Sequence, residues 1–164
     1  MKKISIILIF FFGTFTNTNA ETKRIISGNK NAKITIIAYE SLTCSHCADF
    51  HEKVYPQLKK DYIDTGLAKI EFRHFPLDIA AFNASKIAQC DEGESLNILK
   101  SLYSNQQVWV KGNTIEDINK NLQKFIENEG YNLDFEKCIN NKEIEDFVLN
   151  DRIEGVKNFK INAT

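Results

Sequence analysis

The stretch ITIIAYESLTCSHCADFHEKVYPQL, residues 34–58, decides the fold. Its first part, residues 34–39, is a short and nearly continuous apolar run, which is typical of a strand buried on both faces. The three residues Ser41–Thr43 break this run. From Ser45 onward the apolar residues recur at spacings of three and four, which predicts a helix. The predicted helical stripe consists of Cys47, Phe50, Val54 and Leu58.

A second strand is predicted at residues 68–75 (AKIEFRHF), where Ile70 and Phe72 alternate with charged residues. Gly66 marks the turn that precedes it. Strand, helix and strand then form a right-handed βαβ unit with parallel strands over residues 33–78. Pro56 lies inside the connecting helix, and we expect it to kink that helix rather than end it.

Residues 79–158 are predicted to be a mainly helical insertion in this α/β fold. A first apolar stripe consists of Leu96, Leu99, Leu102 and Tyr103. A second begins after Thr114 as N-cap, stops at Gly130, and consists of Ile115, Ile118, Leu122, Phe125 and Ile126. A last helix is expected to end near residues 155–158, and its apolar residues are Ile144, Phe147, Val148 and Ile153.

The motif Cys44-Ser45-His46-Cys47 opens the first helix and predicts thiol–disulfide chemistry. Cys44 is expected at the helix N-terminus, where unpaired backbone N–H groups and the helix dipole stabilise a thiolate. His46 can add positive charge or a hydrogen bond to the Cys44 sulfur. Cys47 lies one turn into the helix on the apolar stripe and is expected to be buried. Cys44 is then the sulfur that substrates attack, and Cys47 the resolving thiol.

Other roles for this motif are less well supported. A purely structural disulfide across one helical turn closes too short a loop to stabilise much. A zinc site needs a second pair of ligands at metal spacing, and we predict no metal site. A c-type haem would need histidine where Ala48 stands. His51 and His74 are predicted to have structural roles.

Two further cysteines, Cys90 and Cys138, are expected to form a structural disulfide that ties the first inserted helix to a later one. Closing that loop contributes about 4 kcal/mol in the chain-entropy model. An oxidising compartment favours this pairing. Two buried free thiols remain the alternative.

The first twenty residues predict an exported protein. Lys2 and Lys3 precede an apolar stretch at residues 4–12, which is followed by a candidate cleavage site after Ala20. The stretch is far shorter than the ~20 residues that span a bilayer, although an uncleaved anchor is the alternative. We therefore expect residues 1–20 to be a signal peptide, 21–32 to be an N-terminal segment, and the mature protein to lie in the periplasm.

The composition is that of an ordinary globular protein, with 43% hydrophobic and 26% charged residues among 164. Without Lys2 and Lys3 the chain carries 19 basic and 22 acidic residues, a net charge of −3. This balance favours neither a nucleic-acid partner nor a basic membrane-binding patch.

The segment YESLTCSHCADFHEKVYPQL (39–58), together with EFRHFPLD (71–78) and the helical insertion, resembles the DsbA family of thiol–disulfide oxidoreductases. The resemblance implies a thioredoxin-like fold with an inserted helical domain and no bound cofactor. It also implies oxidation of reduced exported polypeptides and reoxidation by a quinone-linked membrane oxidase. The short segment before the first strand leaves no room for a dimerisation domain, so we expect a monomer.

Three positions depart from the family pattern. Ser45 stands where the family often has proline, and the residues between the cysteines tune redox potential. The family's buried acid usually lies six residues before the first cysteine, here Ala38, and Glu40 is a candidate substitute. The chain stops at Thr164, where the family continues into a cis-proline substrate loop. We therefore expect residues 159–164 to begin a thioredoxin half whose last strands and helix are missing from this chain.

These observations together predict a periplasmic oxidoreductase that donates its Cys44–Cys47 disulfide to exported proteins. A reductase of the same fold differs only in redox potential. A peptide-binding module that uses both cysteine pairs structurally is the alternative from another functional class.

Overall fold

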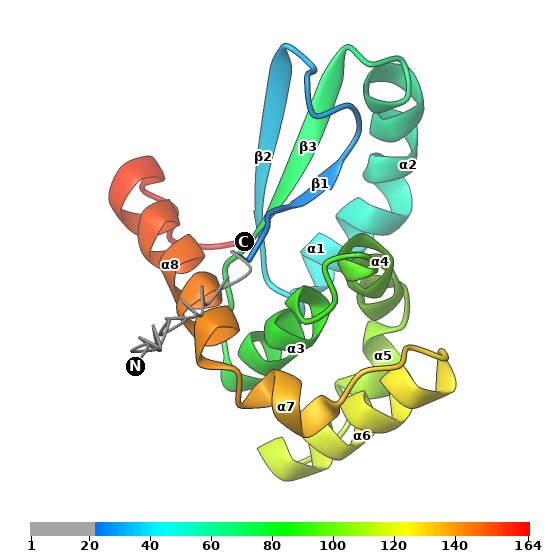
Figure 1. The fold of residues 1–164 in the computed structure, drawn as a ribbon, viewed down its shortest axis with the longest axis vertical. Helices are drawn as coiled ribbons and strands as arrows, with labels where there is room; N and C mark the ends of the chain where they lie inside the picture. Colours follow the sequence, from blue (N-terminus) through cyan, green and yellow to red (C-terminus); the bar gives the residue numbers. More distant parts are fainter. Residues whose placement is uncertain (1–21) are drawn as a thin grey trace, which may run out of the picture.

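The computed structural model describes residues 22–164, so the expected signal peptide lies outside the described residues. Three strands form a mixed sheet in the order β1-β3-β2 (Figure 1). Strand β3 (Ala68–His74) pairs in parallel with β2 (Ile34–Glu40), which confirms the parallel pair predicted from sequence. It also pairs antiparallel with β1 (Ile25–Ser27). Strand β1 was not predicted, because its three residues are too few to show a period.

The helix after the cysteines contains two wide, π-helical turns. It runs through α1 (Ser45–Asp49), η1 (Phe50–Val54), α2 (Tyr55–Leu58) and η2 (Lys59–Ile63). The N–H of Tyr55 bonds to the carbonyl of Phe50, five residues back rather than four. The helix thus continues past the proline at its centre, as predicted, and the distortion takes the form of a widened turn.

This widening makes the predicted apolar stripe wrong at Val54, whereas Phe50 and Leu58 pack partly buried against the core as predicted. Val54 is 52% exposed, whereas His51 and Tyr55 are buried together with Cys47. Each π turn adds a residue to the turn and so changes which side chains face the sheet. The helix therefore presents residues four apart, 47, 51 and 55, to the core.

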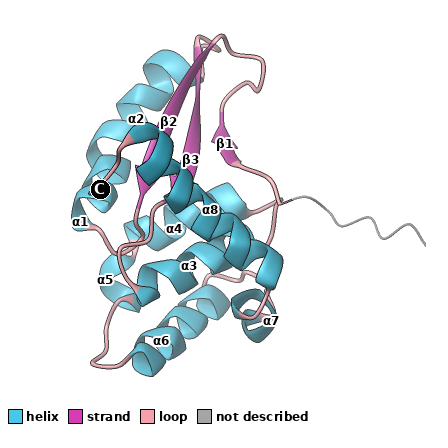
Figure 2. Cartoon of the chain, turned by 90° about the vertical axis from the view of Figure 1, so that its left-hand side faces the viewer, coloured by secondary structure: helices cyan, strands magenta, loops and turns pink. Residues whose placement is uncertain are grey.

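Strand β2 is also less buried than its apolar sequence predicts. Ile34 is 58% exposed and Ile37 is 37% exposed. The helix from α1 to η2 covers one face of the sheet, while α8 (Lys142–Phe159) crosses the other near Tyr39 (Figure 2). Because no second helix of the described chain covers the rest of that face, β2 is a half-buried strand.

The helices after the sheet pack below it and beside it (Figures 1 and 2). In addition to α8 they are α3 (Ile79–Gln89), α4 (Ser95–Ser104), α5 (Gln106–Trp109), α6 (Ile115–Asn128) and α7 (Phe135–Ile139). The expected N-cap is confirmed, because the Thr114 hydroxyl accepts a hydrogen bond from the N–H of Asp117 at 3.2 Å. The fold is thus the expected α/β fold with a large helical part.

Helix α8 ends at Phe159, one residue beyond the expected end near residues 155–158, and Gly155 lies within it. A Cβ at this position would lie 2.9 Å from a ring carbon of Tyr39, so the glycine permits close packing of helix against sheet. The helix ends instead after Phe159, where Lys160 adopts a left-handed conformation with φ of 59°.

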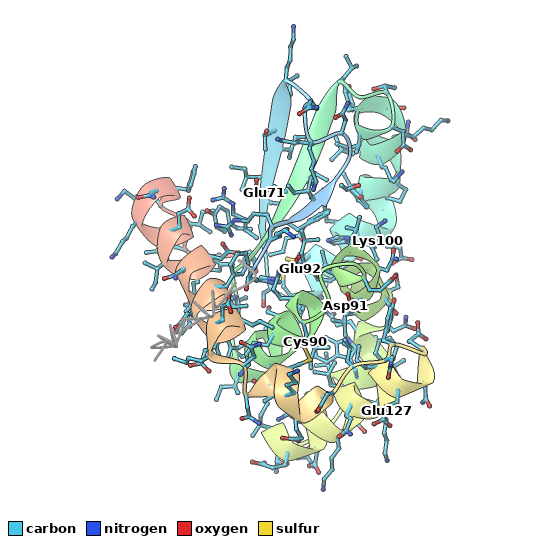
Figure 3. All side chains as sticks on the ribbon, in the orientation of Figure 1. Glu71, Cys90, Asp91, Glu92, Lys100 and Glu127 are labelled. Atoms are coloured by element: carbon cyan, nitrogen blue, oxygen red, sulfur yellow. A yellow bond between two sulfur atoms is a disulfide. The ribbon has the colours of Figure 1, made fainter. Side chains whose placement is uncertain are left out.

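A disulfide joins Cys90, at the end of α3, to Cys138 in α7. It is visible as the yellow bond beside the Cys90 label in Figure 3. The bond joins the first inserted helix to a later one, and the alternative of two free thiols is wrong for this structure. Within residues 22–164, no helix is long and apolar enough to cross a membrane.

Candidate active site

Cys44 caps the first turn of α1, as the sequence predicts. Its backbone is extended, with φ of −76° and ψ of 119°, and the next residue begins the helix. The Cys44 thiol lies 3.4 Å from the main-chain oxygen of Thr164 and donates a hydrogen bond to it. Residues 120 positions apart in sequence therefore meet at the reactive sulfur.

The surroundings of Cys44 favour its thiolate. Burial by itself raises the pKa of Cys44, but hydrogen bonds outweigh it and bring the pKa below its ordinary value. The groups that lower it are the backbone N–H groups of Cys47 and His46 and the side chains of Thr164 and Cys47. Donors at a helix start stabilise an anion in just this way. Cys44 is therefore partly exposed and suited to act as nucleophile and as leaving group.

The surroundings of Cys47 favour its neutral, protonated thiol. Its side chain is buried, with 7% exposure. Burial raises the pKa of Cys47 to about 12, and the negative charges of Cys44 and Glu40 add to the effect. Both cysteines are free thiols in this structure. The pair thus consists of one accessible, acidic thiol and one buried thiol that keeps its proton.

The side chains of the two residues between the cysteines are both exposed to solvent. His46 is exposed, and its backbone N–H, not its imidazole, makes the contact with Cys44. Ser45 is exposed at the first position of α1. Ala38, at the family's usual acidic position, is partly buried. Within the described residues, no group of three or more metal-binding side chains is present.

Glu40 lies next to the site and is paired with a histidine. Its side chain is 8% exposed, and its Oε2 lies 2.8 Å from Nε2 of His51. The His51 ring stacks on Tyr103 with centroids 4.2 Å apart. The position of His51 four residues after Cys47 was a usable sequence signal. Its pairing with Glu40 was not readable, because the π turn selects which helical face is buried.

Gln106 of α5 is a site residue that sequence reasoning missed. Its amide donates to the carbonyl of Leu42 at 2.8 Å and to that of Cys44 at 3.1 Å. These two bonds hold the turn on which the reactive cysteine sits. A partner 62 residues away leaves no local pattern, so no sequence signal could have identified it.

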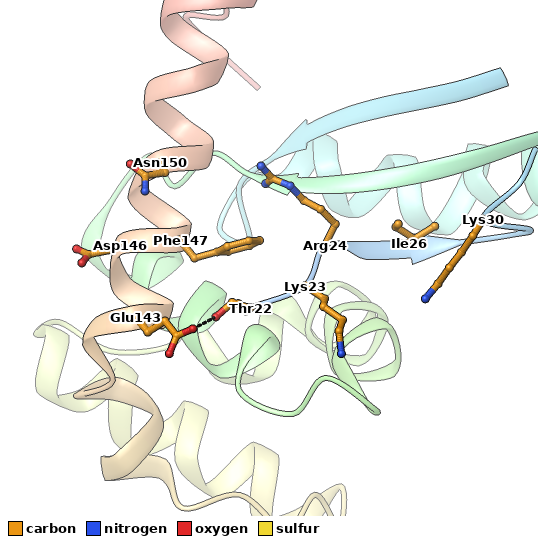
Figure 4. Close-up of a pocket in the computed structure, with 9 residues that line it drawn as sticks. All are labelled: Thr22, Lys23, Arg24, Ile26, Lys30, Glu143, Asp146, Phe147 and Asn150. Atoms are coloured by element: carbon orange, nitrogen blue, oxygen red, sulfur yellow. Dashed lines mark hydrogen bonds between the residues drawn. The ribbon is translucent and has the colours of Figure 1, made fainter. Parts of the chain in front are cut away.

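An open pocket of about 220 Å³ adjoins the cysteines, and its lining includes Ala38, Tyr39, Glu40, His46, Cys47, Phe50 and Thr164. A larger pocket of about 910 Å³ lies between β1 and α8 (Figure 4). Its lining consists of Thr22, Lys23, Arg24, Ile26, Lys30, Glu143, Asp146, Phe147 and Asn150. This larger pocket has no cysteine or histidine, so the chemistry belongs to the smaller one.

Comparison with known proteins agrees with this geometry. Residues 19–164 match the family model described as Thioredoxin. The crystal structure of Wolbachia pipientis α-DsbA1 superposes with a TM-score of 0.77 and 35% identity, covering 86% of this chain and 71% of that one. The chain belongs to the DsbA family.

Other DsbA-like relatives are more distant. A Rickettsia conorii protein named as a protein-disulfide oxidoreductase is 28% identical over 124 residues, or 73% of this chain and 43% of the relative. Disulfide bond formation protein D of Bacillus subtilis is 25% identical over 108 residues, or 60% of this chain and 49% of the relative. The chain thus spans less than half the length of these two relatives. Wolbachia α-DsbA2, at 23% identity and a TM-score of 0.65, shares the fold.

Proposed function

We propose that this protein is a thiol–disulfide oxidase that donates a disulfide between Cys44 and Cys47 to reduced polypeptides outside the cytoplasm. The observation that carries the proposal is the unequal pair at the start of α1. Cys44 is partly exposed and has a lowered pKa, whereas Cys47 is buried and has a pKa of about 12. An oxidase needs this inequality, because it must form mixed disulfides through one sulfur only.

The reaction balances within the pair and the substrate. A substrate thiolate attacks Cys44 Sγ, the bond to Cys47 breaks, and the Cys47 sulfur leaves with the electron pair and takes up a proton. A second substrate thiolate then attacks the substrate sulfur of the mixed disulfide and releases Cys44 as a thiolate. The substrate loses two electrons and gains a disulfide, and the protein gains two electrons.

The direction of transfer follows from the thiolate. Each pKa unit by which the Cys44 thiolate is stabilised favours the reduced pair by about 1.4 kcal/mol. A pair that is stable when reduced gives its disulfide away.

A quinone-linked membrane oxidase is the proposed reoxidant, and the lysine-led apolar start of the sequence supports export. Ser45 and His46 are proposed to tune the redox potential of the Cys44–Cys47 pair.

The test uses the oxidised chain and a reduced model peptide with two cysteines. Wild type should oxidise the peptide, whereas Cys44→Ser and Cys47→Ser, neither of which can form the disulfide, should both abolish oxidation. Unchanged activity in Cys44→Ser would favour a peptide-binding module. Equilibration with glutathione buffers then distinguishes the two directions, since a strongly reducing potential would show a reductase.

A further inference from the structure

Strand β2 forms an open edge of the three-stranded sheet. In the order β1-β3-β2, β3 is central, and β2 lies on the side of the sheet away from β1 (Figure 1). Within residues 22–164, β2 pairs with β3 alone. Its other edge therefore carries main-chain N–H and C=O groups that no strand of the described chain satisfies. Such an edge is a template for a further strand.

The hydrogen bonds to β3 show which residues of β2 face the open edge. In a parallel pair, alternate residues of a strand direct both main-chain groups to the same neighbour. The Glu40 carbonyl accepts a hydrogen bond at 2.8 Å from the N–H of Phe75, directly after β3. The even-numbered residues of β2 therefore bond to β3. The main-chain groups of Thr35, Ile37 and Tyr39 point the other way, to the open edge.

The side chains of these three residues share one face of the sheet, because successive side chains of a strand alternate between faces. Ile36, on the opposite face, packs against the core. Tyr39 contacts Phe159 of α8, with ring centroids 5.7 Å apart. Thr35 is exposed, and Ile37 is 37% exposed. The odd-numbered residues thus offer both free main-chain groups and solvent-exposed side chains.

We propose that two copies of this chain pair antiparallel along β2, with Ile37 of one copy opposite Ile37 of the other. This register sets Thr35 of each copy opposite Tyr39 of the other. Each of the three edge residues then exchanges both of its main-chain hydrogen bonds with the residue opposite. Two three-stranded sheets become one six-stranded sheet with two-fold symmetry, in which neither copy keeps an open β2 edge.

The composition of β2 favours pairing with itself. Natural edges are commonly protected by charged side chains or proline, and residues 34–39 contain neither. Ile37 at the two-fold axis meets its own copy without charge repulsion. The direction follows from Lys33, an exposed residue directly before β2. A parallel pair would set the two lysines side by side, whereas the antiparallel pair places them at opposite ends of the joint strands.

Phe159 extends the contact beyond the strands. It is 51% exposed, and its ring lies against Tyr39 on the face that the odd-numbered residues share. In the joint sheet, Thr35 of the second copy lies beside Tyr39 on that same face. The second copy therefore covers part of the exposed Phe159 ring. The interface combines main-chain hydrogen bonds with apolar contact, as specific interfaces do.

The pairing leaves both active sites in place. Cys44 follows the C-terminal end of β2, and the antiparallel strands put these two ends at opposite ends of the joint sheet. The dimer does not depend on the proposed function, and its test needs no redox reaction. It replaces the monomer expected from the short N-terminal segment, because a sheet edge can pair without a dimerisation domain.

The test measures the mass of the purified full chain by light scattering at rising concentration. Cys44→Ala and Cys47→Ala are present throughout, so that disulfide exchange cannot link two copies. The mass should rise from one chain and level off at two. A mass of one chain at every concentration would overturn the proposal.

The variant that addresses the edge is Ile37→Lys, which removes an isoleucine from each copy and sets two like charges opposite each other. It should raise the dissociation constant of the dimer by roughly a hundredfold. Val54→Lys is the matched control, because Val54 is 52% exposed on the helix at the other face of the sheet. It should leave the dissociation constant unchanged. An equal effect of the two variants would show unspecific apolar association and overturn the pairing.

Single cysteines in the same background report the register. Ile37→Cys places two sulfurs at a residue pair whose Cα atoms are about 5.5 Å apart, which a disulfide can span. Mild oxidation should therefore link two copies through residue 37. Thr35→Cys is the control, because its two copies lie roughly 13 Å apart along the strands. Equal crosslinking of the two variants would overturn the proposed register.

Amide hydrogen exchange in the wild-type chain keeps the proposal testable if a variant does not fold. Exchange at Thr35, Ile37 and Tyr39 should slow as the concentration rises, whereas Ile36 and Ala38, whose N–H groups bond to β3, should exchange slowly throughout. Slow exchange at the three edge residues in a monomer would show that another part of the chain covers the edge. Slowing only when a reduced polypeptide is added would assign the edge to substrate. Either result would overturn the pairing.

Discussion

Replacement of both Cys90 and Cys138 by alanine should lower the free energy of unfolding by about 4 kcal/mol. The two cysteines are 48 residues apart. In the chain-entropy model, a crosslink over that separation removes roughly 14 cal/mol/K from the unfolded chain, or about 4 kcal/mol at 25 °C. A smaller loss is added because Cys138 is only 2% exposed and its sulfur is packed in the core.

The assay is equilibrium unfolding in urea, followed by the fluorescence of Trp109, which is fully buried. With a slope of roughly 2 kcal/mol per molar urea, the midpoint should fall by about 2 M. The control is the double variant Cys44→Ala and Cys47→Ala, because those thiols are not bonded in this structure. A loss below about 1 kcal/mol would refute the loop-entropy reasoning for this disulfide.

Three further changes test other parts of the structure. Gln106→Leu should leave the Cys44 carbonyl without its partner and lower the free energy of unfolding in urea by about 1–3 kcal/mol. It should also slow the attack of Cys44 on dithiobis-nitrobenzoate. An unchanged rate would show that the amide does not position the turn. Burial lowers the pKa of His74 to about 4. The stability that the neutral His74 contributes is therefore complete above pH 6.5, and about 3 kcal/mol of it is lost as the pH falls to 4. His74→Gln should flatten this dependence of the free energy of unfolding on pH. Gly155→Ala should lower the melting temperature, because the new methyl group would press on the Tyr39 ring at a cost of about 1–3 kcal/mol, and an equal or higher melting temperature would contradict the close packing.

The sequence predicted those features that depend on local spacing. Cys44 lies at a helix start because an apolar run, a short break and a helical period follow one another directly. The helix of residues 115–128 has a full apolar stripe and a threonine cap, and both hold in the structure. The same holds for the parallel pair β2 and β3, since a strand–helix–strand order leaves few alternatives.

The features that escaped prediction depend on tertiary contacts. Helix α3 buries nine of its eleven residues, so it has no polar face and shows no clear stripe. The exposure of Ile34 and Ile37 depends on which elements cover β2, and an apolar run does not carry that information. Gln106 reaches the active-site turn from another helix, and only the folded chain brings them together.

The widened turn at Phe50–Val54 separates the long helix into two parts that can change independently. A π turn contains one residue more than an α turn, so deletion of one residue there would restore regular α-helical spacing and leave the residues that follow close to their present orientation. Tyr55 would keep its hydrogen bond to the Ser27 hydroxyl, which is now 2.7 Å long. The first turn, with Cys44 and Cys47, would keep its orientation. The redox end of the helix is therefore insulated from sequence changes at the end that anchors it to the sheet.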